Sequence, residues 1–199
     1  MPACDLRPLG EASLATPRRS MIRSRGPVAK APHPFDAIKW LYHFTDLRNV
    51  PSVHEHGGLW SLREQERKGI GFVAPGGDVD SQRNDREKGW DRYVHCCLYG
   101  ENPMEFRKKQ KGEIGESLFL RIDLAVLHNE GVRFIPGFSN TNGIQDYALA
   151  DAFAAGIVDV GPLYSFDYSR VERWKAAKKF SILVPDHIPL GQLLNLSNG

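Results

Sequence analysis

Short stretches of alternating apolar and polar residues run through the chain from Ile38 onward. Between Ile38 and Phe44 an aromatic ring recurs at every second position, which predicts a β-strand with one buried face. Asn49 and Pro51 then give the start signals of a helix, and Gly57 gives its stop signal. The polar residues that end the strand therefore lie just before a helix, where side chains are well placed to hold a ligand.

The rest of the chain repeats this pattern of short elements separated by Gly, Pro and polar residues. Strands are predicted over Tyr93–Tyr99, Leu118–Ile122, Val132–Ile135 and Phe180–Val184. Helices or helical turns are predicted over Leu62–Lys68, Leu124–Asn129 and the Ala-rich end of Asn140–Ala155, and loops over Phe72–Asp80 and Gly161–Arg170. Many short strands with few helices favour an α+β fold.

The first 35 residues differ from the rest in composition. They are rich in Pro, Ala, Ser and Arg, lack apolar periodicity and carry six basic side chains against two acidic ones. Such a segment buries too little apolar surface to fold, so we expect residues 1–35 to be a disordered basic arm. An arm that contacts phosphates and a translation start at Met21 are the alternatives. Residues 36–199 are expected to form one folded domain.

Composition and charge exclude several classes of protein. The net charge is +2, and the 20 basic and 22 acidic residues outside the arm leave the body nearly neutral, so a nucleic-acid surface has to be local. No apolar run is long enough for a membrane span, and no apolar leader precedes the body. Cys4, Cys96 and Cys97 form neither a disulfide framework nor a zinc-ligand spacing. We therefore expect a cytoplasmic protein without a metal.

Four local motifs carry more specific information. They are Tyr42–Ser52 with His56–Trp60, the arginine-bearing segment Ser81–Arg86, Tyr93–His95 with Asn102–Met104, and Phe180–Pro185. In this order along the chain, from about Trp40 to about Leu190, the motifs resemble the DarT family of DNA ADP-ribosyltransferases. The first motif, which contains His43-Phe44-Thr45, is the most specific of the four.

The resemblance implies the ADP-ribosyltransferase fold, in which two small packed β-sheets with flanking helices enclose an NAD cleft. It also implies an activity, because family members transfer ADP-ribose from NAD, their substrate, to a base in single-stranded DNA. They often act as toxins that a macrodomain antitoxin opposes. Aromatic residues within Asn140–Arg170 and the basic residues that follow fall where the family recognises DNA, although they also suit core filling and a solvated helix.

The resemblance assigns NAD contacts to the first motif. His43 and Thr45 match positions that contact NAD, and an imidazole and a hydroxyl can each donate and accept hydrogen bonds. Phe44 is expected either at the cofactor or in the core. Ser52 and Trp60 fall where the helix and the following turn border the cleft, and Trp60 either stacks on a cofactor ring or fills the core.

The second motif supplies the catalytic arginine that the resemblance implies. Arg83 is the best match and Arg86 the next, because a guanidinium can hold the NAD diphosphate through two hydrogen bonds and assist proton transfer. The alternative is a solvated charge cluster, since acidic residues are close in sequence. Tyr93 and His95 begin the next strand, and they either line the nicotinamide site or serve as a core aromatic and a surface histidine.

Ser181 departs from the family pattern. The family has a glutamate here that hydrogen-bonds the nicotinamide ribose and stabilises the cationic transition state, whereas a serine hydroxyl carries no charge. Loss of such a contact costs about 2.7–4 kcal/mol, or roughly 10²–10³-fold in rate. Either Ser181 leaves a weak or inactive enzyme, or another carboxylate substitutes, for which the acidic residues considered are Glu172, Asp167 and Asp186.

Two alternatives to an active DNA ADP-ribosyltransferase remain. Ser181 suggests a catalytically impaired relative that binds NAD or nucleic acid without turnover. His43, Arg83 and His95 are compatible with an RNA 2′-phosphotransferase, a class that relies on arginine and histidine pairs rather than on a glutamate.

Overall fold

A computed structural model describes residues 35, 38–71, 73–164 and 167–196, all of which lie within the compact unit of residues 32–199. Phe35 is buried, and its ring packs edge-on against Phe153 at a centroid distance of 5.1 Å. Its carbonyl oxygen accepts a hydrogen bond from the Ile38 amide at 2.9 Å. Phe35 therefore belongs to the folded body, and the remainder of the predicted arm lies outside the described residues.

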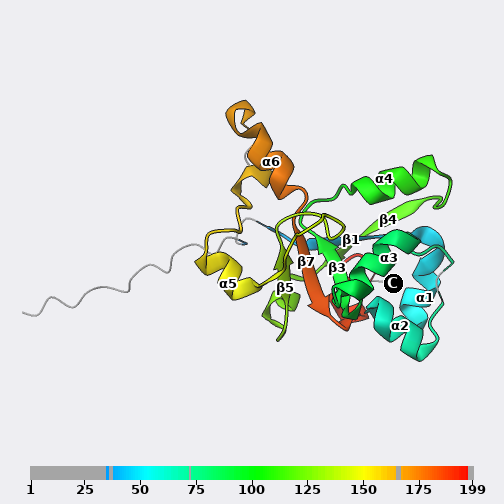
Figure 1. The fold of residues 1–199 in the computed structure, drawn as a ribbon. Coiled ribbons are helices and arrows are strands. Elements are labelled where there is room, and N and C mark those ends of the chain that lie inside the picture. The colour runs from blue at the N-terminus through cyan, green and yellow to red at the C-terminus, as the bar shows by residue number, and fades with distance from the viewer. Residues whose placement is uncertain (1–34, 36–37, 72, 165–166, 197–199) are drawn as a thin grey trace, which may run out of the picture. The chain divides into compact units, whose positions relative to one another are not determined.

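The described part contains a main sheet of six antiparallel strands in the order β4-β1-β3-β7-β5-β6 (Figure 1). The strands are β1 (Leu41–Asp46), β3 (Tyr93–Cys97), β4 (Ser117–Ile122), β5 (Arg133–Ile135), β6 (Tyr147–Ala148) and β7 (Ser181–Pro185). Strand β7 pairs with β3 on one side and with β5 on the other. Its Ile182, Leu183 and Val184 side chains are fully buried, so this strand lies in the middle of the core.

A second sheet pairs β2 (Gly58–Trp60) with β8 (His187–Pro189) in antiparallel register. Gly58 has a φ of 140°, a backbone conformation that L side chains rarely adopt. A Cβ atom at this position would lie 2.1 Å from the backbone carbonyl oxygen of Ile188. The two strands can therefore approach this closely because position 58 has no side chain.

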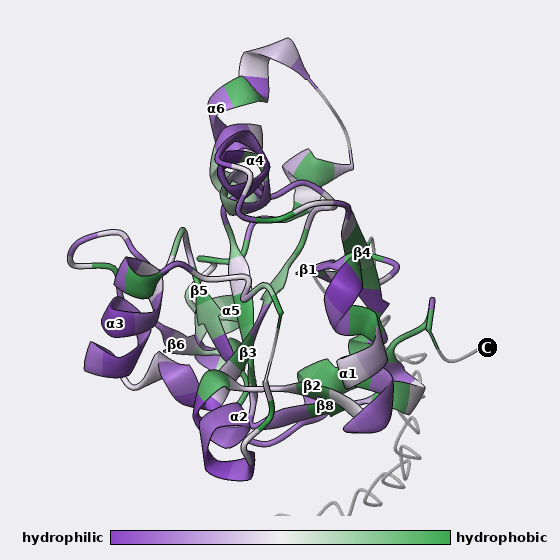
Figure 2. Cartoon of the chain, turned by 90° about the vertical axis from the view of Figure 1, so that its right-hand side faces the viewer, coloured by the Kyte–Doolittle hydropathy of each residue, from purple (hydrophilic) through white to green (hydrophobic). Residues whose placement is uncertain are grey.

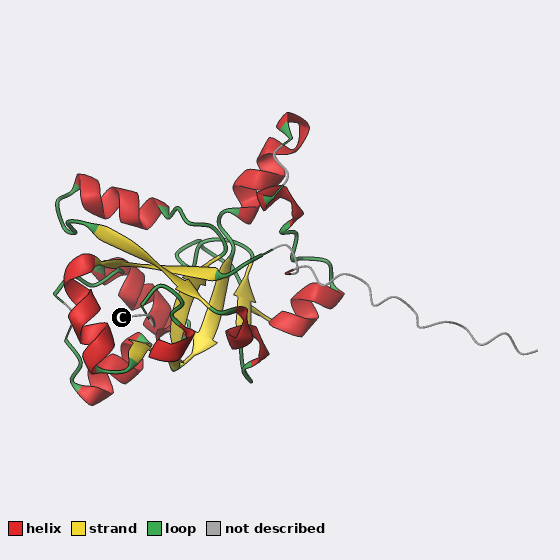
Figure 3. Cartoon of the chain, turned by 180° about the vertical axis from the view of Figure 1, so that it is seen from behind, coloured by secondary structure: helices red, strands yellow, loops and turns green. Residues whose placement is uncertain are grey.

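Short helices surround the sheets (Figure 3). They are α1 (Val50–Glu55), α2 (Leu62–Lys68), α3 (Val79–Glu87), α4 (Pro103–Gln110), α5 (Leu149–Ala154) and α6 (Val171–Ala177), with 3₁₀ turns η2 (Leu47–Asn49), η3 (Trp90–Arg92), η4 (Leu124–His128), η5 (Gly161–Leu163), η6 (Tyr168–Arg170) and η7 (Leu190–Gln192). Ser61, Asp78 and Asn102 cap the starts of α2, α3 and α4 by accepting backbone hydrogen bonds. Figure 2 shows these three helices mostly in hydrophilic colours, as expected for helices that cover a surface.

The predicted α+β class is confirmed by two antiparallel sheets with flanking helices. Helix α2 has the predicted bounds, whereas α3 and α4 were not predicted. The described structure explains this, because the buried residue of α3 is Ser81 and that of α4 is Lys108. A helix without an apolar stripe has no hydrophobic period to detect.

Candidate active site

The main sheet opens into a cleft beside the strands that carry the first and third motifs. β1 and β3 pair only between Tyr42 and Cys97, so the two strands diverge beyond this point. Residues of α2, α3, α4 and the 138–140 segment close the space between them, which measures about 350 Å³ and lies in the size range of small-molecule sites. The predicted site residues that line this cleft together are His43, Phe44, Thr45, Trp60 and Ser181.

His43 is held in one tautomer. Its Nδ1 lies 2.9 Å from the backbone carbonyl oxygen of His95. A carbonyl oxygen can only accept, so Nδ1 carries the proton and Nε2 keeps its lone pair. Burial lowers the pKa of His43, which keeps the ring neutral at neutral pH. His43 therefore offers a ligand an uncharged hydrogen-bond acceptor.

Asn49 joins the end of β1 to the loop that contains Val73 and Ala74. Its Nδ2 donates to Thr45 Oγ1 at 3.2 Å and to the Ala74 carbonyl at 2.7 Å. Its Oδ1 accepts from the amides of Val73 at 3.0 Å and Ala74 at 3.2 Å. Asn49 stands at the predicted N-cap position of α1, but its side chain makes no capping bond. The side chain instead fixes the Thr45 hydroxyl and the loop in one arrangement.

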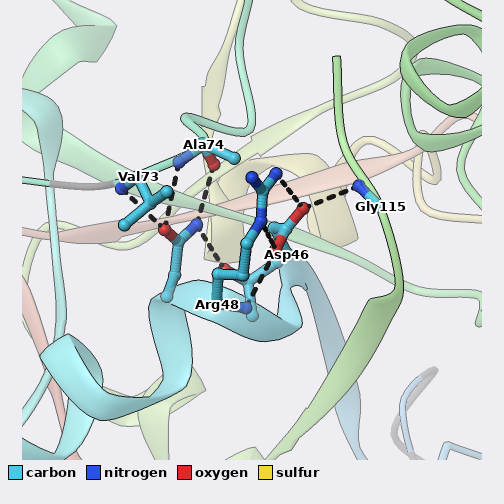
Figure 4. A network of polar contacts seen from close by, with 7 residues as sticks. Asp46, Arg48, Val73, Ala74 and Gly115 are labelled. Carbon is cyan, nitrogen blue, oxygen red and sulfur yellow. Dashed lines mark hydrogen bonds and ion pairs between the residues drawn. The ribbon is translucent and has the colours of Figure 1, made fainter. Parts of the chain in front are cut away.

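Asp46 ties the same strand end to a second loop (Figure 4). Its carboxylate accepts from Arg48 Nε and Nη2, each at 2.8 Å, and from the Gly115 amide at 2.8 Å. The Arg48 guanidinium and the Gly115 amide hold the pKa of Asp46 well below its usual range. The polar end of β1 is thus anchored on both of its sides.

The two aromatic residues predicted at the site are packed within the chain. Phe44 is 9% exposed and belongs to a small apolar cluster under the cleft wall. The Trp60 ring stacks on His187 with a centroid distance of 3.7 Å, and Lys68 Nζ lies 4.3 Å from the Trp60 centroid. A face covered at 3.7 Å has no room for an ammonium as well, so both faces of Trp60 are engaged. Trp60 therefore lines the cleft by its edge.

Ser181 enters the cleft from β7, opposite Cys97 of β3. None of the acidic residues considered from the sequence lies beside it. The Glu172 carboxylate is 80% exposed on α6, and neither Asp167 nor Asp186 lines the cleft. The structure thus provides no carboxylate from these three positions to replace the family glutamate.

Ser52 and Arg83 do not line the cleft. The Ser52 hydroxyl donates to the Gly71 carbonyl at 3.3 Å. Arg83 follows the cleft-lining Gln82 on α3, and its 63% exposed side chain pairs with Asp80 at 2.9 Å. Exposed pairs of this kind contribute little and exchange easily. The assignment of Arg83 as the catalytic arginine stays a prediction.

Two charged residues that the sequence did not single out line the cleft. Among the lining residues in the described part, Arg107 of α4 is the only Lys or Arg, and Asp85 of α3 is the only Asp or Glu. Arg86, the second arginine candidate, does not line it. The helix-start pair Asn102-Pro103 could have predicted α4, and Arg107 lies about one turn into that helix. Asp85 had no such signal, because a charged segment usually indicates a solvated helix.

The described residues contain no group of three or more His, Cys, Asp or Glu side chains arranged to hold a metal ion. No helix among them is long and apolar enough to cross a membrane. Cys96 and Cys97 are free thiols on neighbouring positions of β3.

Solved structures share this architecture. DarT from Thermus sp. 2.9 in complex with ADP-ribosylated ssDNA matches with a TM-score of 0.60 at 13% identity, over 79% of each chain. DarTG from Thermosipho africanus in complex with ADP-ribose gives 0.58 at 20% identity, over 76% of this chain and 41% of that one. Thermus sp. 2.9 DarT in complex with carba-NAD+ gives 0.52 at 16% identity, over 82% and 81%. The fold is therefore that of the DNA-modifying ADP-ribosyltransferases.

A family model described as ssDNA thymidine ADP-ribosyltransferase, DarT, matches residues 42–196. The match spans well over half of the chain and includes all four motifs. The chain belongs to the DarT family, as the motifs predicted. No curated protein sequence matches it.

Proposed function

We propose that this chain transfers ADP-ribose from NAD to a thymidine base in single-stranded DNA. The observation that carries the proposal is that His43, Thr45 and Ser181 line one cleft, although His43 and Thr45 are far from Ser181 in the sequence. The family description names thymidine in ssDNA, and relatives of the same fold were solved with NAD+ and with ADP-ribosylated ssDNA.

His43 and Thr45 bind NAD in this proposal. His43 accepts a hydrogen bond through Nε2, and the Thr45 hydroxyl, whose oxygen already accepts from Asn49, donates one. Arg107, as the guanidinium of the cleft, holds the diphosphate, because its paired N–H groups match two phosphate oxygens. Of the two roles predicted for Arg83, the diphosphate passes to Arg107 in this proposal, and assistance to proton transfer stays with Arg83. Orienting the nicotinamide ribose in this way favours the oxocarbenium-like transition state.

Mass spectrometry of single-stranded oligonucleotides incubated with NAD and the purified protein tests the proposal. An oligonucleotide with thymidine should gain one ADP-ribose, and one of equal length without thymidine should not. His43→Ala should remove the product, whereas His128→Ala, at an exposed histidine of η4, should leave it unchanged. If no oligonucleotide of any base composition gains mass while calorimetry shows NAD binding, the proposal is wrong.

A relative that binds NAD without turnover is the second candidate. Ser181 favours it, because serine carries no charge at the position where the family has a glutamate. Ser181→Glu should raise the transfer rate by roughly 10²–10³-fold, since a carboxylate here stabilises the cationic transition state. Ser181→Gln has a similar shape without the charge and should stay near the wild-type rate. Turnover of NAD by the wild-type protein would exclude this candidate. No observation favours an RNA 2′-phosphotransferase, because just one Lys or Arg of the described residues lines the cleft.

We also propose that the chain acts as a cytoplasmic toxin opposed by a macrodomain antitoxin. Membership of the DarT family supports this role. Induced expression in bacteria should stop growth, and His43→Ala should not. Co-expression of a macrodomain that removes ADP-ribose from DNA should restore growth. Normal growth with an active, expressed wild-type protein would contradict the toxin role.

A further inference from the structure

Asp85 is the one carboxylate among the described residues that line the cleft. Its side chain is 17% exposed, and its Oδ2 lies 3.8 Å from Nε2 of His95. Its Oδ1 is buried and has no hydrogen-bond partner. One carboxylate oxygen is thus buried, and the other faces the His95 imidazole.

His95 is also held in one tautomer. Its Nε2 lies 3.2 Å from the carbonyl oxygen of Trp90, and a carbonyl requires a donor, so Nε2 carries the proton. Nδ1 is then the bare nitrogen, and it has no hydrogen-bond partner among the described residues. A bare imidazole nitrogen with a carboxylate behind the opposite nitrogen is the arrangement of a proton acceptor.

The register of the main sheet places His95 beside the position of the absent glutamate. His95 lies opposite Leu183, and Cys97 lies opposite Ser181. His95 and Ser181 are therefore diagonal neighbours on one face of the sheet, about 7–8 Å apart. A ligand oriented at Ser181 has His95 within reach of its reacting end.

We propose that His95, positioned by Asp85, is the base that takes the proton from the acceptor, an inference that rests on the proposed function. In the step, the bond between the ribose carbon and the nicotinamide nitrogen breaks, and its electron pair leaves with neutral nicotinamide. The ribose carbon forms a bond to the ring nitrogen of thymine. The proton of that N–H group passes to His95 Nδ1, and Asp85 stabilises the imidazolium that results.

The charges around the pair agree with this role. Burial raises the pKa of Asp85, and the His95 imidazole and the Ser139 hydroxyl oppose that rise. Lys88 lowers the pKa of Asp85 and Asp91 raises it. His43, whose Nδ1 bonds to the His95 carbonyl oxygen, has its pKa lowered by burial and stays neutral. The charged partner nearest to His95 is therefore Asp85.

The pH dependence of transfer to thymidine tests the inference. The pH profile of wild-type transfer should differ from that of a variant that lacks the His95 imidazole. His95→Gln should reduce transfer at pH 7 by roughly 10²–10⁴-fold and should show a rate that rises about tenfold per pH unit up to pH 9, because the thymine N–H must then ionise by itself. Asp85→Asn should lower the rate without changing the KM for NAD, and Asp85→Glu should recover part of it. His128→Gln and Asp151→Asn, at exposed positions, are matched controls.

The outcomes separate this inference from the proposed function. Absence of transfer by the wild-type protein would overturn both. Transfer by the wild type with an unchanged pH profile in folded His95→Gln and Asp85→Asn would overturn the inference alone. If the variants do not fold, nitrogen NMR of the wild type still decides, because a proton on His95 Nδ1 instead of Nε2 would remove the base.

Discussion

Arg83 and Arg107 lie on the consecutive helices α3 and α4, and they differ in what surrounds them. Arg107 lines the cleft and forms no ion pair among the described residues, whereas Arg83 does not line it and pairs with Asp80. A guanidinium without a partner has no internal bond to lose when it binds an anion. At the residue scale, Arg107 is therefore the group prepared to hold a diphosphate, and Arg83 must first leave its exposed pair to reach the reacting groups.

Arg107→Gln should raise the Kd for NAD by about 10- to 150-fold, since a hydrogen bond to a charged group contributes about 1.5–3 kcal/mol. Arg83→Gln should change the Kd by less than about threefold and lower the transfer rate instead. Calorimetry with NAD and the oligonucleotide assay measure the two quantities. A larger loss of NAD affinity in Arg83→Gln than in Arg107→Gln would reverse these assignments.

The elements above the cleft are joined by buried polar contacts as well as by the apolar cluster that contains Phe44 and Ala74. Asn49 holds the loop at Ala74, and the Lys108 ammonium of α4 holds it at the Pro75 carbonyl, 3.0 Å away. Both anchors are nearly inaccessible to solvent, with Asn49 2% and Lys108 5% exposed. An unpaired group at either position would be costly, so strand β1, helix α4 and the loop between them hold one another in place.

Asp46 makes the stability of this region depend on pH. Its folded pKa is depressed, so it contributes stability that is fully present above the unfolded value of about 3.9 and is lost as pH falls through the folded value. Asp46→Asn should therefore lower the free energy of unfolding more at pH 7 than at pH 3. Urea unfolding of both proteins at the two pH values measures this difference. An equal effect at both values would show that the charge of Asp46 does not matter.

The sequence predicted strands β1, β3, β4, β5 and β7 of the main sheet, but it predicted neither the short strands β2, β6 and β8 nor the polar anchors. The aromatic alternation predicted β1, which is a local property of sequence, although burial along the strand does not alternate: Leu41 and Phe44 are buried, and Tyr42 between them is half-buried. The use of Asn49 as an anchor depends on Ala74, 25 residues away, and the sequence around Asn49 indicates just a helix start. Trp60 shows the same limit, because the stack on His187 that engages its ring forms only when β2 and β8 pair.

The cleft is bordered by strands of both sheets and by the three helices α2, α3 and α4. A ligand bound there contacts segments that are far apart in sequence and that meet only in the folded state. At the scale of the whole molecule, binding therefore stabilises the native fold against the unfolded chain.

NAD at 100 times its Kd should raise the midpoint of thermal unfolding by about 5–11 °C. The expected gain is about 2.7 kcal/mol, and each kcal/mol shifts the midpoint by about 2–4 °C for a chain of this size. Thermal unfolding with and without NAD measures the shift, and Arg107→Gln at the same NAD concentration should show a smaller one. No shift at saturating NAD would mean that the folded cleft does not bind it.

The absence of a side chain at Gly58 affects how mutational data on this protein should be interpreted. Any side chain there would collide with the facing strand, so the second sheet would come apart although no reacting group had been touched. In a genetic screen for lost activity, substitutions at position 58 would score like substitutions of His43. A screen that measures only activity would thus classify Gly58 as a catalytic residue. A parallel measurement of the amount of folded protein would distinguish Gly58 from His43.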